Sequence, residues 1–326
     1  MSSSRRPSGR INWLKGAVAA MSTRIDPVGG QAVIEGVMMR GVHGVGVAVR
    51  SPEGDIRIKQ EVLESWRQRY PILKLPFVRG VAALVESMSV GIRMLNYSAS
   101  VASGEKEEEQ GGGWFGMVIG LGIAVLLFKF LPAQALEWLK AFTDNRILLN
   151  VTEGLIRMTI FLAYLLGISR FDEVKRLFQY HGAEHQVINC LEAGKEVTVE
   201  NALKFSPIHP RCGTSFLLVT LLLSIAVFSF ISLDIGALER TAVKLALLPV
   251  VAGLAFELIR LAGKTSTDKS ANFLAWTAYW LTAPGMWLQR VTTRPANADQ
   301  IEVAIASLNA ALAIQPEGMR TEPQVP

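Results

Sequence analysis

The segment GTSFLLVTLLLSIAVFSFISL, residues 213–233, carries no charged side chain. A helix needs about twenty mostly apolar residues to cross the hydrocarbon core of a bilayer, so this segment is long enough to span it. Three further apolar segments have a suitable length: residues 114–131, 147–168 and 241–262. Half of all residues are hydrophobic and the mean hydropathy is +0.30. The sequence therefore predicts a mainly helical, polytopic membrane protein with about four spans.

Few ionisable residues interrupt these segments. Glu153 and Arg157 are four residues apart, the spacing at which side chains on one helix face meet. We expect a buried ion pair there rather than a proton path. Glu257 lies near one end of the fourth segment, where a charge is costly unless it is paired or functional.

The basic residues predict the orientation of the chain. The connection 169–212 and the segment after the fourth span hold more Lys and Arg than the connections 132–146 and 234–240. With four spans, the N-terminal section, the 169–212 connection and the C-terminus share one side, which the positive-inside rule makes the cytoplasm. The formal charge of +5 is mild and spread along the chain, so the expected partner is the lipid bilayer and not nucleic acid. The sequence does not indicate an oligomeric state.

Residues 28–64 have strand-like alternation, and Pro52-Glu53-Gly54 between two such runs is a hairpin turn sequence. We expect a small N-terminal antiparallel sheet of about three strands. Glu35 and Arg40 interrupt an otherwise apolar or Gly-rich run. They indicate either a solvated face of a strand or a position at the end of the sheet that supports a site or contacts substrate.

Shorter helices are expected around the spans. Residues 76–98 and 299–314 have the periodicity of amphipathic helices. Residues 271–288 are rich in Trp and Tyr and contain Pro284-Gly285, which favours an interfacial or re-entrant helix broken at that pair over a full span. The chain is thus divided into a flexible basic N-terminus (1–25), a cytoplasmic β section with an amphipathic helix (26–110), a membrane bundle (111–290) that includes a site-bearing helix and loop (169–212), and a C-terminal helix and tail (291–326).

Three of the four histidines lie close together in the sequence. His181 and His185 are one helical turn apart, so a helix over residues 171–192 presents both imidazoles from one face, as in sites that give two nitrogens to one metal ion. Glu184 lies between them, and His-x-x-Glu-His is the inverted form of the zinc-protease motif. His209 is bracketed by two prolines that fix its backbone, which suits a third ligand.

The expected metal ligands are the two helical histidines, His209 and Glu257, and the expected cofactor is a divalent transition metal, zinc in the first place. Three of these ligands, either three nitrogens or two nitrogens and a carboxylate oxygen, would leave a position open for water, as in catalytic zinc sites. Glu184 is the candidate base. Cys212 is an alternative soft ligand, or a nucleophile activated by a histidine. The residues expected to support the site or contact substrate are Glu35, Arg40, Arg211 and Cys212.

The same residues are also compatible with a role that involves no catalytic metal. An isolated pair of histidines one turn apart is more often packing than a metal site, and Glu184, the 209–212 turn and Glu257 shift the balance toward a metal. One function class is a metal-dependent hydrolase acting at the cytoplasmic membrane face on a peptide bond, a lipid-like ester or a phosphoester. The other is a non-enzymatic transporter or assembly factor with a structural metal. The inverted motif favours a peptidase only by analogy.

Four segments of the sequence carry a family resemblance: GGQAVIEGVMMRG at 29–41, YHGAEH at 180–185, HPRCGTSF at 209–216 and PGMWLQ at 284–289. Together they closely resemble the YqhQ-like family of bacterial membrane proteins, over residues 27–312. The resemblance implies a multi-pass bacterial membrane protein with a metal site at His181, His185 and His209. Together with the orientation expected from the basic residues, this predicts a protein of the bacterial inner membrane with both termini in the cytoplasm. The family is described as predicted metal-dependent enzymes of unknown function, so no substrate is implied.

Overall fold

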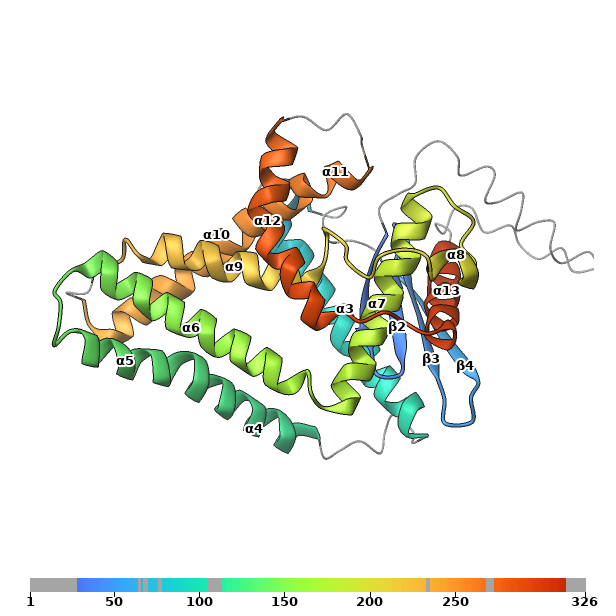
Figure 1. The fold of residues 1–326 in the computed structure, drawn as a ribbon, viewed down its shortest axis with the longest axis horizontal. Coiled ribbons are helices and arrows are strands. Elements are labelled where there is room, and N and C mark those ends of the chain that lie inside the picture. The colour runs from blue at the N-terminus through green and yellow to red at the C-terminus, as the bar shows by residue number, and fades with distance from the viewer. Residues whose placement is uncertain are drawn as a thin grey trace, which may run out of the picture.

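The computed structural model of the chain describes residues 28–63, 66, 70–75, 78–104, 113–232, 235–267 and 273–314. Figure 1 shows a bundle of long helices on one side and a small sheet covered by helices on the other. The expected mainly helical fold with an N-terminal antiparallel sheet is confirmed.

Four long helical segments form the bundle. Helix α4 (Gly113–Val125) continues through a π-helical turn (Leu126–Phe130) into α5 (Leu131–Leu139), and α6 (Arg146–Ile168) runs back beside it (Figure 1). Helices α9 (Gly213–Phe228) and α10 (Ala237–Ala262) form the second antiparallel pair. Three helices in the described residues are long and apolar enough to cross a membrane: Val118–Leu139, Arg146–Ile168 and Leu238–Ala262.

The segment expected to be the strongest span forms a shorter helix. Helix α9 ends at Phe228, and its 16 residues extend only about 24 Å at 1.5 Å per residue. The Asn150 amide on α6 donates to the carbonyls of Ser229 (3.3 Å) and Ile231 (2.8 Å). These bonds satisfy carbonyl groups beyond the helix end, so the chain can leave the helix within the bundle.

The expected ion pair in α6 is present, and it belongs to a cluster of more charged residues than predicted. Glu153 is buried and accepts from Arg157 (2.9 Å) on α6 and from Arg240 and Lys244 on α10. Arg157 Nε also donates to the Phe128 carbonyl, 3.0 Å away in the π turn. Charged groups therefore connect three segments of the bundle through direct contacts.

The N-terminal sheet has four antiparallel strands, not the three expected. They are β1 (Gly29–Val33), β2 (Gly36–Arg40), β3 (Gly44–Arg50) and β4 (Ile56–Val62), in the order β1-β2-β3-β4. The segment 29–33 carries a weak strand signal, because Val33 is its only β-branched residue. Glu35 lies in the turn between β1 and β2, with the uncommon φ of 51°. The predicted hairpin turn between β3 and β4 is confirmed, and Gly54 adopts φ of 93° there.

Both faces of the sheet are buried. One face packs against α3 (Val78–Ser103), where Val33, Val47 and Met94 share a hydrophobic cluster. The other face packs against α7 (Asp172–Glu192) and α13 (Ala298–Leu312). The 299–314 segment thus forms the predicted amphipathic helix, which completes the core of the β section instead of lying apart as a C-terminal unit. The expected boundary at residue 110 falls outside the described residues.

Helix α12 (Phe273–Thr292) is continuous through Pro284-Gly285, so the predicted break at this pair is wrong. The glycine has a packing role instead, because a Cβ at Gly285 would lie 2.8 Å from the Ser215 side chain on α9. The remaining described helices are short: a 3-10 turn at Pro71–Lys74, α8 (Val199–Ala202) and α11 (Lys264–Thr267).

Candidate metal centre

Helix α7 positions the two histidines of the predicted motif. Asp172 and Glu173 in its first turn suit the positive end of the helix dipole, and Gly194, with φ of 66°, follows its last turn. A Cβ at Gly182 would collide with the Arg294 carbonyl, so this glycine lets α7 pack closely against the segment that follows α12.

Both histidines are held through one ring nitrogen. His181 Nδ1 lies 2.8 Å from the Thr292 carbonyl and His185 Nδ1 lies 2.7 Å from the Pro207 carbonyl. A carbonyl oxygen only accepts, so each Nδ1 carries a proton, and each Nε2 is the nitrogen that can coordinate a metal when it is unprotonated. The ring centroids are 4.5 Å apart. Two imidazoles thus present coordinating nitrogens side by side, oriented in the way that metal-ligating histidines usually are.

Cys212 supplies a third donor atom beside these nitrogens. Its Sγ lies 3.2 Å from His181 Nε2, and the donor atoms of His181, His185 and Cys212 all lie within 4.8 Å of one another. Cys212 directly precedes α9, so its sulfur lies at a positive helix end. Burial raises the pKa of the Cys212 thiol, but the imidazoles of His185 and His181 outweigh burial and hold this pKa well below 9.0. The lowered pKa favours the thiolate, the form that binds metals.

The neighbouring sulfur in turn shifts the pKa of His181. Burial lowers the pKa of His181, but Cys212 and then Glu184 raise it to about 9. Without a cation between them, His181 and Cys212 form an imidazolium–thiolate pair. Two neutral imidazoles and a thiolate around one point are equally the donor set that zinc prefers, and three protein donors leave a fourth tetrahedral position open. The residues present therefore fit a divalent transition metal.

Glu184 lies on the side of α7 that faces the sheet. It is buried, and a Cβ at Gly30 would lie 2.9 Å from its Cγ and Cδ, so the glycine of β1 makes room for the carboxylate. Burial is the largest influence on the pKa of Glu184 and raises it, while His185, His181 and a hydrogen bond from the Gly30 backbone act against it. A carboxylate with a raised pKa is suited to accept and return a proton near neutral pH.

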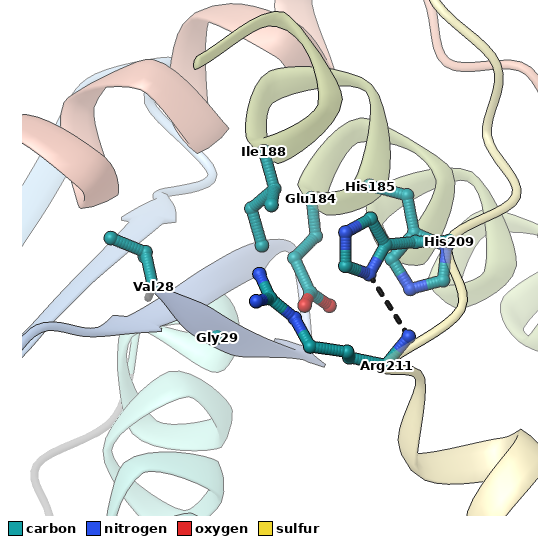
Figure 2. A pocket seen from close by; sticks show the side chains of 7 residues that line it. All are labelled: Val28, Gly29, Glu184, His185, Ile188, His209 and Arg211. Atoms are coloured by element: carbon teal, nitrogen blue, oxygen red, sulfur yellow. Dashed lines mark hydrogen bonds between the residues drawn. The ribbon is translucent and has the colours of Figure 1, made fainter. Parts of the chain in front are cut away.

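A pocket of about 230 Å³ opens beside these groups. Figure 2 shows Glu184, His185, His209 and Arg211 around it, with Val28 and Gly29 of the sheet edge on one side and Ile188 above. The predicted base and one predicted ligand thus line a space that could hold a substrate. Arg211, expected as a supporting or substrate-contacting residue, also lines it.

His209 is near the predicted site but is not one of the three clustered donors. Its ring centroid lies 5.8 Å from that of His185. Its Nδ1 accepts from the Arg211 N–H (3.2 Å), drawn in Figure 2, and its Nε2 donates to Glu192 (3.2 Å). Both ring nitrogens are therefore engaged, and the structure brings Cys212 to the histidine pair in the place expected for His209.

Glu257, the other expected ligand, forms a two-pronged ion pair with Arg79 of α3, with both contacts at 2.6 Å. It is not among the clustered donors of the described residues. Arg40 lies on β2 and pairs with Glu86 of α3 at 2.6 Å. Glu35 pairs with Arg176 and accepts from the Tyr180 hydroxyl at 3.3 Å. These contacts tie helices to the sheet or to one another.

Comparison with known families matches residues 75–314 to the family described as "Protein of unknown function (DUF1385)". The Uncharacterized protein YqhQ of Bacillus subtilis (strain 168) is 35% identical over 306 residues, which cover 88% of this chain and 92% of the relative. The chain belongs to the DUF1385 family. This match confirms the family that the sequence motifs indicated. No solved structure matches the chain significantly.

All three clustered donors lie inside the DUF1385 match, whereas strands β1 to β4 precede it. The sequence did not reveal the groups that hold the histidines of this site in place. The carbonyls of Thr292 and Pro207 carry no side-chain signal at all. Gln289, which accepts from the His209 N–H (2.8 Å) and donates to its carbonyl (2.8 Å), could have been found as the last residue of the PGMWLQ motif.

Proposed function

We propose that this protein is a metal-dependent hydrolase of the bacterial inner membrane, with its active site at the cytoplasmic face. The observation that carries the proposal is the convergence of His181, His185 and Cys212 donor atoms within 4.8 Å of one another, next to a pocket lined by Glu184. Three donors with an open side and an adjacent buried carboxylate match catalytic sites better than structural ones, which use four protein ligands.

Each residue has a distinct part in hydrolysis. A zinc or similar ion held by the three donors would act as a Lewis acid and lower the pKa of a water molecule. Glu184 takes a proton from the attacking water, whose oxygen bonds to the electrophilic carbon or phosphorus, and returns that proton to the leaving group as the old bond breaks. Thr292 and Pro207 fix the imidazoles through their carbonyls. Glu192 holds Arg211 and His209 at the pocket wall.

The bundle supports the membrane location. The C-terminal ends of α6 and α10 and the N-terminal end of α9 lie on the side of the sheet. The other ends of these three helices lie at the opposite end of the bundle (Figure 1). The metal centre and sheet then share one side, which the positive charges in 169–212 assign to the cytoplasm.

A second candidate function rests on the His181–Cys212 contact. An Sγ to Nε2 distance of 3.2 Å, with a thiolate facing an imidazolium, is also the arrangement of a cysteine nucleophile with its histidine partner. In that case Cys212 attacks the substrate directly, and a thiol-alkylating reagent abolishes turnover in metal-free protein. A metal-dependent enzyme stripped of metal is already inactive.

Substitution of Glu184 tests the proposal. Glu184→Gln keeps the size of the side chain and removes its basicity, so we expect unchanged metal content and at least about a 100-fold loss of kcat on the hydrolysed member of a peptide, ester and phosphoester panel. Glu173→Gln, at an exposed acid on the same helix, is the matched control and should leave kcat unchanged. A Glu184→Gln variant with full turnover would show that Glu184 is not the base. Wild-type protein that holds metal but turns over no member of the panel would favour a structural metal in a non-enzymatic protein.

A further inference from the structure

The outer edge of the sheet leads into the pocket. Strand β1 is the first in the sheet order, so among the described strands it pairs with β2 alone. Gly29, Gly30 and Gln31 are exposed, and Gly29 lines the pocket together with Glu184. The edge of β1 and the candidate active site are thus continuous, as Figure 2 shows from close by.

The hydrogen-bond register shows which backbone groups of β1 point away from the sheet. Gly41 N–H donates to the Gly44 carbonyl across the β2–β3 turn, so odd-numbered residues of β2 bond to β3 and even-numbered residues bond to β1. The even-numbered residues of β2 are paired with odd-numbered residues of β1. The N–H and C=O groups of Gly30 and Ala32 therefore point outward from the edge.

These outward groups have the spacing of a strand-binding edge. The Gly30 N–H hydrogen-bonds to Glu184, whereas its carbonyl and both backbone groups of Ala32 have no partner among the described residues. A row of alternating N–H and C=O groups at strand spacing is complementary to a peptide backbone, and neither a lipid ester nor a phosphoester offers the matching groups. Because Gly29 and Gly30 have no side chains, another backbone can approach closely.

We propose that the substrate is a polypeptide segment that binds in an extended conformation along the edge of β1 that no other described strand covers, with its scissile peptide bond at Glu184. This inference rests on the proposed hydrolase function and narrows its substrate class. Water adds its oxygen to the carbonyl carbon, the C–N bond breaks, and the proton taken by Glu184 goes to the leaving amine. Pairing with β1 would set the register of the bound segment. The residue of the segment that pairs with Ala32 determines which of its peptide bonds lies at the Glu184 carboxylate.

The first experiment uses the intact, metal-loaded protein in detergent and a proteome-derived peptide library, with cleavage products identified by mass spectrometry. We expect cleavage by the wild type and none by Glu184→Gln. A cleaved peptide is then resynthesised with single N-methyl groups along its backbone. Methylation at alternate positions on one side of the scissile bond should raise KM more than about tenfold, and methylation at the intervening positions less than about twofold, because only every second amide of a paired strand faces its neighbour.

A substitution tests the same edge from the protein side. Ala32→Pro removes the outward N–H without removing a bond to β2, as proline does on edge strands. It should raise KM for the cleaved peptide about tenfold while changing kcat less than about threefold. Ile58→Pro is the matched control, since Ile58 is exposed and its N–H points outward from the opposite edge, at β4. The N-methyl series on the wild type gives the answer even if Ala32→Pro does not fold.

The outcomes separate the two proposals. An absence of any cleaved peptide, or N-methyl effects without a period of two, would overturn the edge-binding inference. If the wild type hydrolyses an ester or phosphoester and Glu184→Gln does not, the hydrolase function stands and only the peptide substrate falls. If neither protein hydrolyses anything while both retain metal, both proposals fall.

Discussion

Cys212 shows how three ordinary influences act on one atom. Its sulfur is buried, which disfavours charge, yet it lies at the start of α9 and beside two imidazoles, which favour charge more strongly. The carbonyls of Thr292 and Pro207 hold the Nδ1 atoms of the two histidines, so that each Nε2 is the nitrogen available to a metal. The donor set is therefore built as much by backbone groups as by the side chains that a sequence displays.

Gly30 is the residue whose small size most directly protects the site. A Cβ at this position would lie 2.7 Å from the Met38 carbonyl and 2.9 Å from Glu184 Cγ and Cδ. We expect Gly30→Ala to lower the free energy of unfolding by about 1–3 kcal/mol through overpacking, and to lower kcat at least about tenfold by displacing Glu184. Urea unfolding and steady-state kinetics measure the two effects.

Gly29→Ala serves as the control for that substitution, since a Cβ there meets nothing within 4 Å. Its effect on unfolding should stay within about 0.5 kcal/mol. Equal effects of the two substitutions would show that Gly30 does not make room for Glu184.

At the same scale, helical spacing predicted two of the three clustered donors, His181 and His185. The role of Glu184 as the base stays a prediction. The sequence favoured His209 over Cys212 as the third because both residues lie in one turn before α9, and spacing cannot say which side chain turns inward. The structure places His209 between Glu192 and the Arg211 amide, a contact with a residue from the end of another helix that no local pattern encodes.

At the scale of elements, Glu192 joins the end of α7 to the connection before α9. Burial raises its pKa, but the hydrogen bond from His209 and the charge of Arg211 together outweigh burial and lower it below 4.5. Burial lowers the pKa of His209, which therefore stays neutral and donates to the charged carboxylate. These contacts hold the pocket wall against the helix that carries the site.

A carboxylate with a depressed folded-state pKa stabilises the fold above its unfolded pKa, and the stabilisation is lost as pH falls through the folded value. We therefore expect Glu192→Gln to lower the free energy of unfolding by about 3–5 kcal/mol at neutral pH, because it leaves Arg211 without its partner. The difference from wild type should shrink as pH falls below 4.5. Unfolding curves in detergent at several pH values measure it.

Glu200→Gln is the control for the pH series, since the pair that Glu200 of α8 forms with Lys204 is exposed. Exposed pairs contribute little, so a change of no more than about 1 kcal/mol is expected. A difference between Glu192→Gln and wild type that grows in acid would contradict the assigned charge state.

Element prediction succeeded where side-chain periodicity is strong and failed where tertiary contacts decide. The site-bearing helix was expected over 171–192 and runs over Asp172–Glu192. The break at Pro284 was wrong because Gly285 packs against α9, and the length of α9 was overestimated because Asn150 of another helix binds the carbonyls beyond its end. Neither contact is visible in the segment it affects.

At the scale of the whole molecule, the bundle and the sheet unit have separate hydrophobic clusters. Helix α7 follows α6 of the bundle directly and packs beside the sheet (Figure 1). The proposed topology puts Lys195 in the cytoplasm and Phe142, exposed between α5 and α6, on the opposite side. A membrane-impermeant maleimide should label Phe142→Cys in intact cells, and Lys195→Cys only after permeabilisation. The two native cysteines are buried, and wild-type protein measures their background labelling. The reverse labelling pattern would place the metal centre outside the cytoplasm.

The proposed chemistry depends on His181, His185 and Cys212 together holding one divalent metal ion. Elemental analysis of the detergent-purified protein measures this ion, with wild type, His181→Ala, Cys212→Ala and His209→Ala compared side by side. We expect about one equivalent of zinc or a similar metal in the wild type and in His209→Ala, and its loss from His181→Ala and Cys212→Ala. Metal that survives in Cys212→Ala but leaves in His209→Ala, or no metal in any of the four proteins, would refute the three-donor site.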